Sequence, residues 1–188
     1  MFDAADAKIP VEVLAAHVAK KSDLLHHVNP SVMETLVAAV FRDFFSCEVT
    51  HCGRSHDGGV DLLLVQGDQT IPIQVKRHAK PDAVEQVKVV REMFGVLFRD
   101  GYKRGMVVST AKRFSPEAIK EVNKVIAENR CDTFELVDLD RFAGMLRLVR
   151  NPDEQPPWLD LLPRFRSESA QQRFLAGLPA ARKCGITL

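Results

Sequence analysis

Asp61, Gln74 and Lys76 stand out because they are polar residues set among strongly apolar segments. Asp61 directly precedes the run Leu62–Val65, and the other two flank Val75. A carboxylate and an amide oxygen are ligands that Mg²⁺ prefers, and a backbone carbonyl such as that of Val75 can add a third. A lysine beside them can stabilise negative charge and orient or help to activate an attacking water. These residue types indicate metal-dependent attack on a phosphodiester.

The two apolar segments predict a β-hairpin, because β-branched runs flank Gln66-Gly67-Asp68-Gln69. With Gly67 and Asp68 as a two-residue loop, Asp61 lies opposite Gln74. Side chains alternate along a strand, so Asp61, Gln74 and Lys76 are expected to share one face. The opposite face is then fully apolar, with Val60, Leu62, Leu64, Ile71, Ile73 and Val75. A slip of one residue would destroy this sorting.

Two interpretations of the polar group stay open. A strand pair this apolar is expected to be covered on both faces, where polar groups are costly unless they are satisfied. The simpler interpretation is an Asp61–Lys76 ion pair with Gln74 as a hydrogen-bonding neighbour. The other is a metal site, to which Glu34 on the preceding predicted helix adds a carboxylate. Glu34 also has the capping-box spacing from Ser31, which would give it a structural role only.

The order and spacing of these residues resemble the catalytic core of Mrr-like restriction endonucleases. This is a branch of the PD-(D/E)xK nucleases that carries Gln in place of the second acidic residue. The resemblance starts at Glu34 and includes Gly58-Gly59-Val60-Asp61 and Gln74-Val75-Lys76-Arg77. It covers roughly residues 30–148, through Val84–Val87, Arg104–Ser109, Phe114–Ala118 and Phe134–Asp138.

The resemblance implies a restriction-endonuclease-like αβββαβ core and cleavage of double-stranded DNA with Mg²⁺, for which Mn²⁺ can substitute. Carried over by position, the catalytic residues are Asp61, Gln74, Lys76 and Glu34, and the metal ligands are Asp61, Gln74 and the Val75 carbonyl. Members of the family often carry a winged-helix recognition domain before the core. The roughly 28 residues that precede the core here are too few for such a domain.

A mixed order of helices and strands is expected to position the site. Residues 3–27 predict one helix or two short ones, and Asn29-Pro30-Ser31 starts a helix that runs to about Phe45. Strands are expected at 47–52, 60–65, 70–76, 105–109 and 133–137, and further helices at 82–98, 115–129 and 140–148. The expected fold is α/β, a mixed central sheet flanked by helices.

Three regions are predicted along the chain. A helical extension covers residues 1–28, and the nuclease domain covers residues 29–150. Residues 151–188 form a Pro-rich extension with a short helix near 170–178 and are a candidate dimer or partner surface.

Polar residues around the site are the candidate DNA contacts. The resemblance assigns Asp57 to a frequent acidic position in the loop before Asp61. The other candidates are His56 in the same loop, Arg77 after the catalytic strand, Gln86 in the next helix, and Lys112 and Arg113 after the following strand. Basic side chains at one edge of the sheet would bind backbone phosphates, although charged clusters are more often simply solvated.

Composition limits the class of protein. The 188 residues carry a net charge of +1, and 46% are hydrophobic, which is typical of globular domains and unlike a purely electrostatic DNA binder. No segment approaches the roughly 20 apolar residues of a membrane span, and no signal-peptide pattern is present. We therefore expect a cytoplasmic protein without a membrane association.

Cysteines and aromatic residues suggest no second site. The four scattered cysteines form no CxxC pair, which predicts free thiols. A zinc site formed by Cys47, His51, Cys52 and His56 would match no standard spacing. The phenylalanines at 41, 44, 45, 94 and 98 have helical spacing and are expected in the core.

The predicted function is DNA cleavage in defence against foreign DNA. A homodimer is expected because both strands must be cut, and a separate recognition or gating subunit would supply what an attached recognition domain supplies elsewhere. Two alternatives remain. One is a catalytically silent or partner-gated nucleic-acid-binding protein of the same fold. The other is a nuclease that acts on branched DNA or RNA.

Overall fold

The computed structural model describes residues 10–52 and 59–150 of the chain. Within these ranges the helices are α1 (Val11–Lys20), the 3₁₀ helix η1 (Ser22–His26), α2 (Pro30–Phe45), α3 (Val87–Asp100), α4 (Pro116–Ala127) and α5 (Leu139–Arg150). The strands are β1 (Glu48–His51), β2 (Leu62–Gln66), β3 (Gln69–Lys76), β4 (Val84–Glu85), β5 (Arg104–Ser109), β6 (Arg113–Phe114) and β7 (Thr133–Val137). The predicted 170–178 helix lies outside the described residues.

A five-stranded mixed sheet forms the centre of the fold, with the strand order β1-β2-β3-β5-β7. Strands β1, β2 and β3 pair antiparallel, whereas β3, β5 and β7 pair parallel. Leu62 pairs with Ile73 and Gln66 with Gln69, so Gly67 and Asp68 form the predicted two-residue loop. The α/β fold class and this hairpin register are confirmed.

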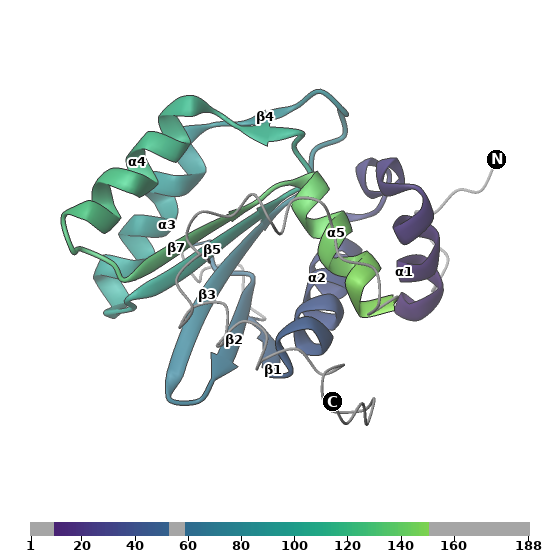
Figure 1. Cartoon of the computed structure of the whole chain (residues 1–188), viewed down its shortest axis with the longest axis horizontal. Helices are drawn as coiled ribbons and strands as arrows, with labels where there is room; N and C mark the ends of the chain where they lie inside the picture. The colour runs from purple at the N-terminus through teal and green to yellow at the C-terminus, as the bar shows by residue number, and fades with distance from the viewer. Residues whose placement is uncertain (1–9, 53–58, 151–188) are drawn as a thin grey trace, which may run out of the picture.

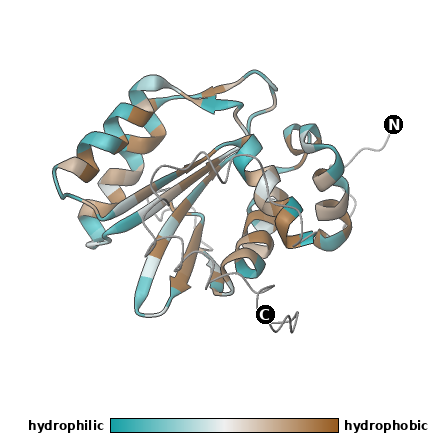
Figure 2. Ribbon diagram, in the orientation of Figure 1, coloured by the Kyte–Doolittle hydropathy of each residue, from teal (hydrophilic) through white to brown (hydrophobic). Residues whose placement is uncertain are grey.

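Helices cover both faces of the sheet (Figure 1). The apolar cluster on one face draws on α1, η1, α2 and α5, and the cluster on the other face draws on α3 and α4. Figure 2 shows apolar residues along most of the sheet strands, as expected for strands buried on both sides. Leu14, Val18 and Leu25 belong to the first cluster, so residues 10–28, expected as an extension, share the core of the domain.

Three local expectations differ from the structure. Val60 packs in the cluster under α3 and α4, not with Leu62, because β2 begins only at Leu62 and Gly59 turns the chain at φ 97°. The helix expected from residue 82 begins at Val87, since the two preceding residues of β4 pair with β6. Phe98 is 92% exposed and is not part of the core.

Membrane association was not expected, and no described helix is both long enough and apolar enough to span a bilayer.

Asp138 directly precedes α5 and caps it, and its side chain provides a stability test. Its Oδ1 accepts a hydrogen bond from the Arg141 N–H at 3.0 Å. Ala at this capping position is expected to lower the free energy of unfolding by about 1 kcal/mol. Burial raises the pKa of the Asp138 carboxyl despite the hydrogen bond from Arg141. Because the raised pKa means that the folded state disfavours the charged form, stability decreases as pH rises through the titration of Asp138.

Asn keeps an oxygen acceptor without the charge, so Asp138→Asn should be at least as stable as the parent protein at pH 7. That advantage should disappear below about pH 3, where the acid is protonated in both states. Urea unfolding at both pH values measures the effect. An Asn variant that loses as much stability as the Ala variant at pH 7 would contradict this account of the cap.

Candidate active site

The predicted site residues of β3 lie at its carboxyl end, beside the matching end of β5. Lys76 pairs with Ser109 and Gln74 with Val107 across the parallel strands. Since side chains alternate, Gln74 and Lys76 share the face of the sheet that also carries Ser109. This face and edge are therefore where polar side chains gather.

Asp61 is held between two strands although it precedes β2. Its N–H donates to the Ile73 carbonyl, and its own carbonyl accepts from the Cys52 N–H, both at 2.9 Å. Its carboxylate Oδ2 accepts a hydrogen bond from the Val75 N–H at 2.6 Å. The N–H and C=O of one strand residue point to the same side, so the Val75 carbonyl also faces Asp61. Asp61 and the Val75 carbonyl are thus side by side.

Burial raises the pKa of Asp61, and the Val75 hydrogen bond and the nearby Lys76 ammonium partly offset that effect. The pKa of Glu34 is also raised, first by burial and then by the negative charge of Asp61, whereas His51 lowers it. The structure therefore brings Glu34 of α2 close enough to Asp61 for the two carboxylates to repel each other. A bound cation would relieve this repulsion.

Neither simpler interpretation of these residues holds among the described residues. Asp61 and Lys76 do not form an ion pair within 4.0 Å there. Asn29, and not Ser31, caps α2, because its side chain accepts from the Ser31 N–H at 3.1 Å. Glu34 consequently lies beyond the first turn and has no place in a capping box.

Gln74 provides the feature that best fits a metal. Its side chain is 3% exposed, and its Oε1 is buried without a hydrogen-bond partner among the described residues. Gly59 packs against the same amide, because a Cβ at Gly59 would lie 2.7 Å from Gln74 Nε2. A buried amide oxygen without a donor is costly, and a cation would satisfy it.

Oxygen donors dominate this group, which suits Mg²⁺ better than zinc. The donors are the carboxylates of Asp61 and Glu34, the Gln74 amide oxygen and the Val75 carbonyl. Within residues 10–52 and 59–150, no three His, Cys, Asp or Glu residues gather into a metal-binding group. The zinc site considered for Cys47, His51 and Cys52 accordingly finds no support in this part of the chain.

The residues predicted to contact DNA differ in their exposure and in their hydrogen-bond partners. Arg77 turns inward, with Nη1 donating to the His26 carbonyl at 3.4 Å and a buried Nε. Gln86 is exposed at the start of α3, where its Nε2 donates to the Val84 carbonyl at 3.0 Å.

Lys112 and Arg113 are exposed beside the carboxyl end of β5, and Lys112 forms an ion pair with Asp82 at 3.4 Å. His56 and Asp57 lie outside the described residues. Of the predicted contacts that the structure describes, Gln86, Lys112 and Arg113 are thus exposed, whereas Arg77 is half-buried.

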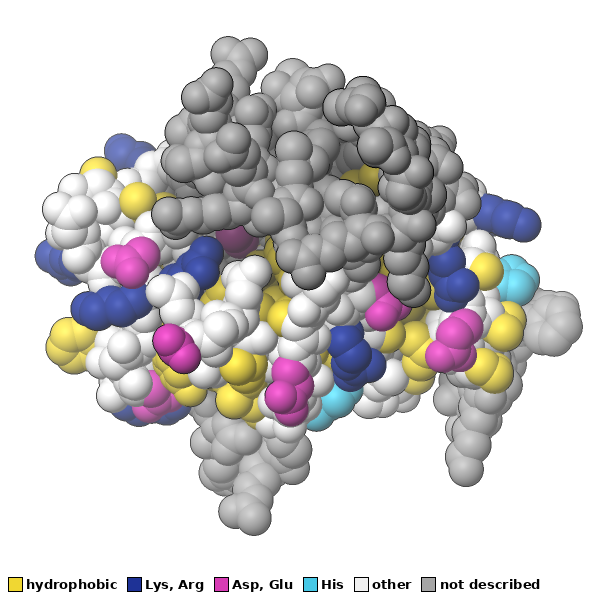
Figure 3. Space-filling view, turned by 60° about the horizontal axis from the view of Figure 1, so that its bottom comes forward, with side chains coloured by type: hydrophobic (Ala, Val, Ile, Leu, Met, Phe, Trp, Pro, Cys, Tyr) yellow, Lys and Arg dark blue, Asp and Glu magenta, His cyan; other side chains and the backbone are white. Residues whose placement is uncertain are grey.

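Surface charge is mixed rather than concentrated. Figure 3 shows Lys and Arg side chains interspersed with Asp and Glu over the visible described part of one face. This agrees with the net charge of +1. DNA contact would therefore depend on a few local cations and not on a broad basic surface.

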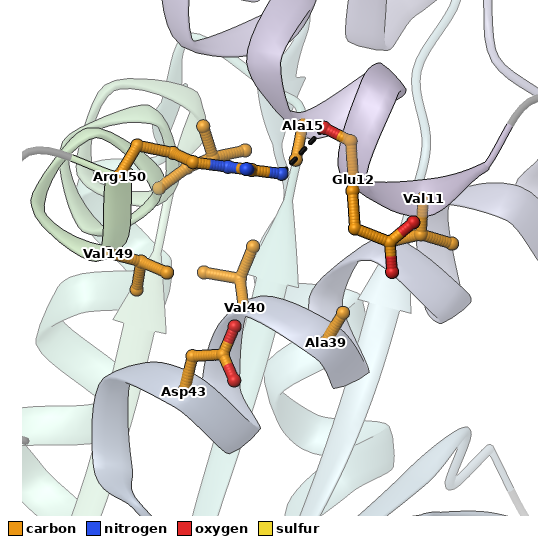
Figure 4. A pocket seen from close by; sticks show the side chains of 9 residues that line it. Val11, Glu12, Ala15, Ala39, Val40, Asp43, Val149 and Arg150 are labelled. Atoms are coloured by element: carbon orange, nitrogen blue, oxygen red, sulfur yellow. Dashed lines mark hydrogen bonds between the residues drawn. The ribbon is translucent and has the colours of Figure 1, made fainter.

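A small cleft of about 60 Å³ lies elsewhere, between α1, α2 and α5 (Figure 4). Arg150 crosses it, and its Nη2 donates to the Glu12 carbonyl at 2.6 Å. Asp43, which also lines the cleft, is nine residues from Glu34 on the same helix, or about 13 Å along the axis. The cleft is therefore not part of the polar site.

Sequence patterns did not reveal every residue of this region. His51 was considered only for zinc, yet its charge acts on Glu34. Gly59 was named only as part of the segment that carries the resemblance, and its contact with Gln74 has no signature in the sequence. Glu85 and Ser109, which form a buried network beside Lys76, were assigned no role.

Comparison with known proteins identifies the family and the fold. The Mrr catalytic-domain family, described as restriction endonuclease, matches residues 25–146. A search of curated proteins finds no significant match.

Several solved structures share the fold, among them the following two. A protein of unknown function, AF1548, is 17% identical with a TM-score of 0.52, and the match covers 80% of this chain and 79% of that one. The restriction endonuclease FokI bound to DNA is 10% identical with a TM-score of 0.51, and the match covers 84% of this chain and 33% of FokI. This chain therefore corresponds to about a third of FokI.

Proposed function

The chain belongs to the Mrr restriction endonuclease catalytic-domain family, and we propose that it is a cytoplasmic, Mg²⁺-dependent endonuclease that cleaves double-stranded DNA in defence against foreign DNA. The observation that carries this proposal is the buried Gln74 Oε1, which has no partner in the described structure and lies in a strand beside Asp61. If this position had only a structural role, an apolar residue would fill it without the free-energy penalty of a buried, unpaired oxygen.

Asp61, Gln74 and the Val75 carbonyl would hold the metal, with Glu34 as the carboxylate contributed by α2. Mg²⁺, or Mn²⁺ in its place, supplies a Lewis acid for phosphate oxygens and lowers the pKa of water. The Val75 N–H holds one oxygen of Asp61, which leaves the other oxygen available as a ligand. Burial of both carboxylates favours their pairing with a cation over solvation.

Lys76 would act on the reacting phosphate. Its ammonium is close enough to Asp61 to lower the pKa of that carboxyl, so it lies at the same site. There it would stabilise the negative charge that grows on the phosphate oxygens and orient the attacking water. Exposed Lys112 and Arg113 would bind backbone phosphates from the neighbouring strand end, and Gln86 would be within reach of the same DNA.

Two further features of the assembly belong to the proposal. A homodimer would present two sites to the two DNA strands. A separate recognition or gating subunit would set the target sequence. Both are compatible with the match to about a third of FokI, in which the remainder of the protein lies outside the shared fold.

Cleavage of supercoiled plasmid tests the function through its metal requirement. The purified protein should nick or linearise the plasmid with Mg²⁺ or Mn²⁺, and EDTA should abolish the reaction. Methylated and unmethylated plasmid are compared, with Asp61→Ala as the control against contaminating nuclease. Cleavage that persists in EDTA or in the Asp61 variant would contradict the proposal. Metal-independent DNA binding without cleavage, also on branched DNA and RNA, would favour a binding protein of this fold.

A further inference from the structure

A buried hydrogen-bond network lies beside Lys76, on the side of β3 away from Asp61. Its centre is Glu85 of β4, which is 8% exposed. Glu85 Oε2 accepts hydrogen bonds from His78 Nε2 at 2.7 Å and from Ser109 Oγ at 2.8 Å. Ser109 is fully buried, whereas the His78 side chain is 33% exposed, so the network is buried at Ser109 and reaches the surface at His78.

The network is attached to the backbone that carries Lys76. Ser109 is the register partner of Lys76, and Thr110 N–H donates to the Lys76 carbonyl at 2.9 Å. Thr110 Oγ1 in turn accepts from the His78 N–H at 2.7 Å. The chain is therefore held at Lys76 and again two residues later. Glu85 is bonded to Ser109 at the end of β5 and to His78 in the segment that follows β3.

Glu85 is itself fixed by the small β4–β6 ribbon. The Ser115 N–H donates to the Glu85 carbonyl at 2.8 Å, and the Lys112 N–H donates to the Ala83 carbonyl at 3.0 Å. The ribbon thus holds the Glu85 side chain from outside the central sheet. His26, which is 2% exposed, adds a contact from the N-terminal helices through its Nδ1 and the His78 carbonyl at 3.0 Å.

A buried carboxylate is expensive even when its hydrogen bonds are made, and replacement by apolar residues often gives a more stable protein. No step of the proposed reaction uses Glu85. We propose that Glu85 is a positioning residue. Through Ser109 and His78 it holds the Lys76 end of β3 in the geometry required for cleavage. This inference rests on the proposed nuclease function.

Two replacements of Glu85 separate positioning from a direct role of its charge. Both hydrogen bonds end on one oxygen, so the amide oxygen of Glu85→Gln can accept both, whereas Glu85→Leu accepts neither. Ser109→Ala removes one of the two bonds with a smaller change in volume. Glu92→Leu on α3 is the matched control, because Glu92 is exposed and, in the part of the chain that the structure describes, pairs only with Lys88 of the same helix.

In steady-state plasmid cleavage, Glu85→Leu and Ser109→Ala should lower kcat by about 10- to 100-fold and change KM by less than about twofold. Glu85→Gln and the control should stay within about threefold of the parent protein. Parental activity in Glu85→Leu would overturn the proposal. Equal losses in Glu85→Gln and Glu85→Leu would also overturn it, because the negative charge itself would then be required.

Hydrogen exchange tests the same proposal without cleavage. The amide protons of Thr110 and His78 should exchange at least about tenfold faster in Glu85→Leu than in the parent protein, and at the parental rate in Glu85→Gln. If Glu85→Leu does not fold, plasmid cleavage and hydrogen exchange of Ser109→Ala test the positioning role in its place. A parent protein that cuts no DNA would refute the nuclease function alone, and unchanged exchange in the variants would refute the positioning role.

Discussion

Replacement of Lys76 with Ala should lower the rate of DNA cleavage by about 10²- to 10⁴-fold, the range attributed to a positioned proton-transfer or charge-stabilising group. The physical reason is the place of the ammonium. It follows Gln74 on the same face of β3 and acts electrostatically on Asp61. Single-turnover cleavage with saturating Mg²⁺ measures the chemical step apart from product release.

Lys76→Ala should change folding little. Lys76 is half-buried and forms no ion pair with a described residue, so its loss leaves no buried partner uncompensated. Binding of DNA should weaken far less than cleavage. The thermal unfolding midpoint and a filter-binding Kd serve as the two checks.

Two further variants make this test specific. Lys76→Arg keeps the charge but replaces a compact ammonium with a larger planar fork, so it should recover only a small part of the rate. Lys80→Ala, at an exposed lysine in the segment that follows β3, should retain nearly all activity. Cleavage by Lys76→Ala at a rate close to that of Lys80→Ala would show that Lys76 is not catalytic.

Much of the fold follows from local patterns. The hairpin register could be predicted because Gly67-Asp68 suits a two-residue loop and the alternation of Leu62, Leu64 and their partners buries a single apolar face. The start of α2 could be predicted because Asn29 caps it and Pro30 follows. Both features depend on residues that are near one another along the chain.

Errors occurred where distant contacts decide the structure. Val84 and Glu85 fit the helical period that follows them, but pairing with β6 and the buried bonds of Glu85 make them a strand. Phe98 fits the apolar spacing of α3 and is nevertheless exposed, because helical spacing does not indicate how far a partner surface extends. Val60 changes faces because a positive φ at Gly59 precedes it.

The candidate site was predictable in part, because strand alternation and hairpin pairing are local patterns. Alternation along β3 was enough to place Gln74 and Lys76 on one face, and pairing with β2 was enough to bring Asp61 near them. The approach of Gly59 to the Gln74 amide could not be predicted, because it depends on the path of the chain through a turn. The influence of His51 on Glu34 likewise depends on how β1 lies beside α2.

Gln74→Leu should have opposite effects on cleavage and on stability. Leu fills a similar volume without an oxygen, so it removes one donor from the proposed metal site, and cleavage should fall by at least about 100-fold. In the absence of metal, the same change removes a buried Oε1 that has no partner among the described residues. The free energy of unfolding should therefore stay the same or rise by about 1–3 kcal/mol.

Gln74→Glu provides the contrasting variant. It adds a third carboxylate near Asp61 and Glu34. Burial already raises the pKa of both of these carboxyls, and the charge of Asp61 raises the pKa of Glu34 further. Metal-free Gln74→Glu should be less stable than the parent protein, and Mg²⁺ should restore its stability, since a ligand bound only to the folded state stabilises it. Unfolding of all three proteins with and without Mg²⁺ measures this pattern.

The two variants together distinguish a metal site from a structural amide. If Gln74 only supports packing, Gln74→Leu should keep its activity, and Mg²⁺ should have no greater effect on Gln74→Glu than on the parent protein. If Gln74 is a ligand, stabilisation by Mg²⁺ should increase in the order Leu, Gln, Glu, because affinity for a hard cation follows the charge and number of oxygen donors. Because the order is measured by unfolding, it tests the metal site independently of which DNA the enzyme cleaves.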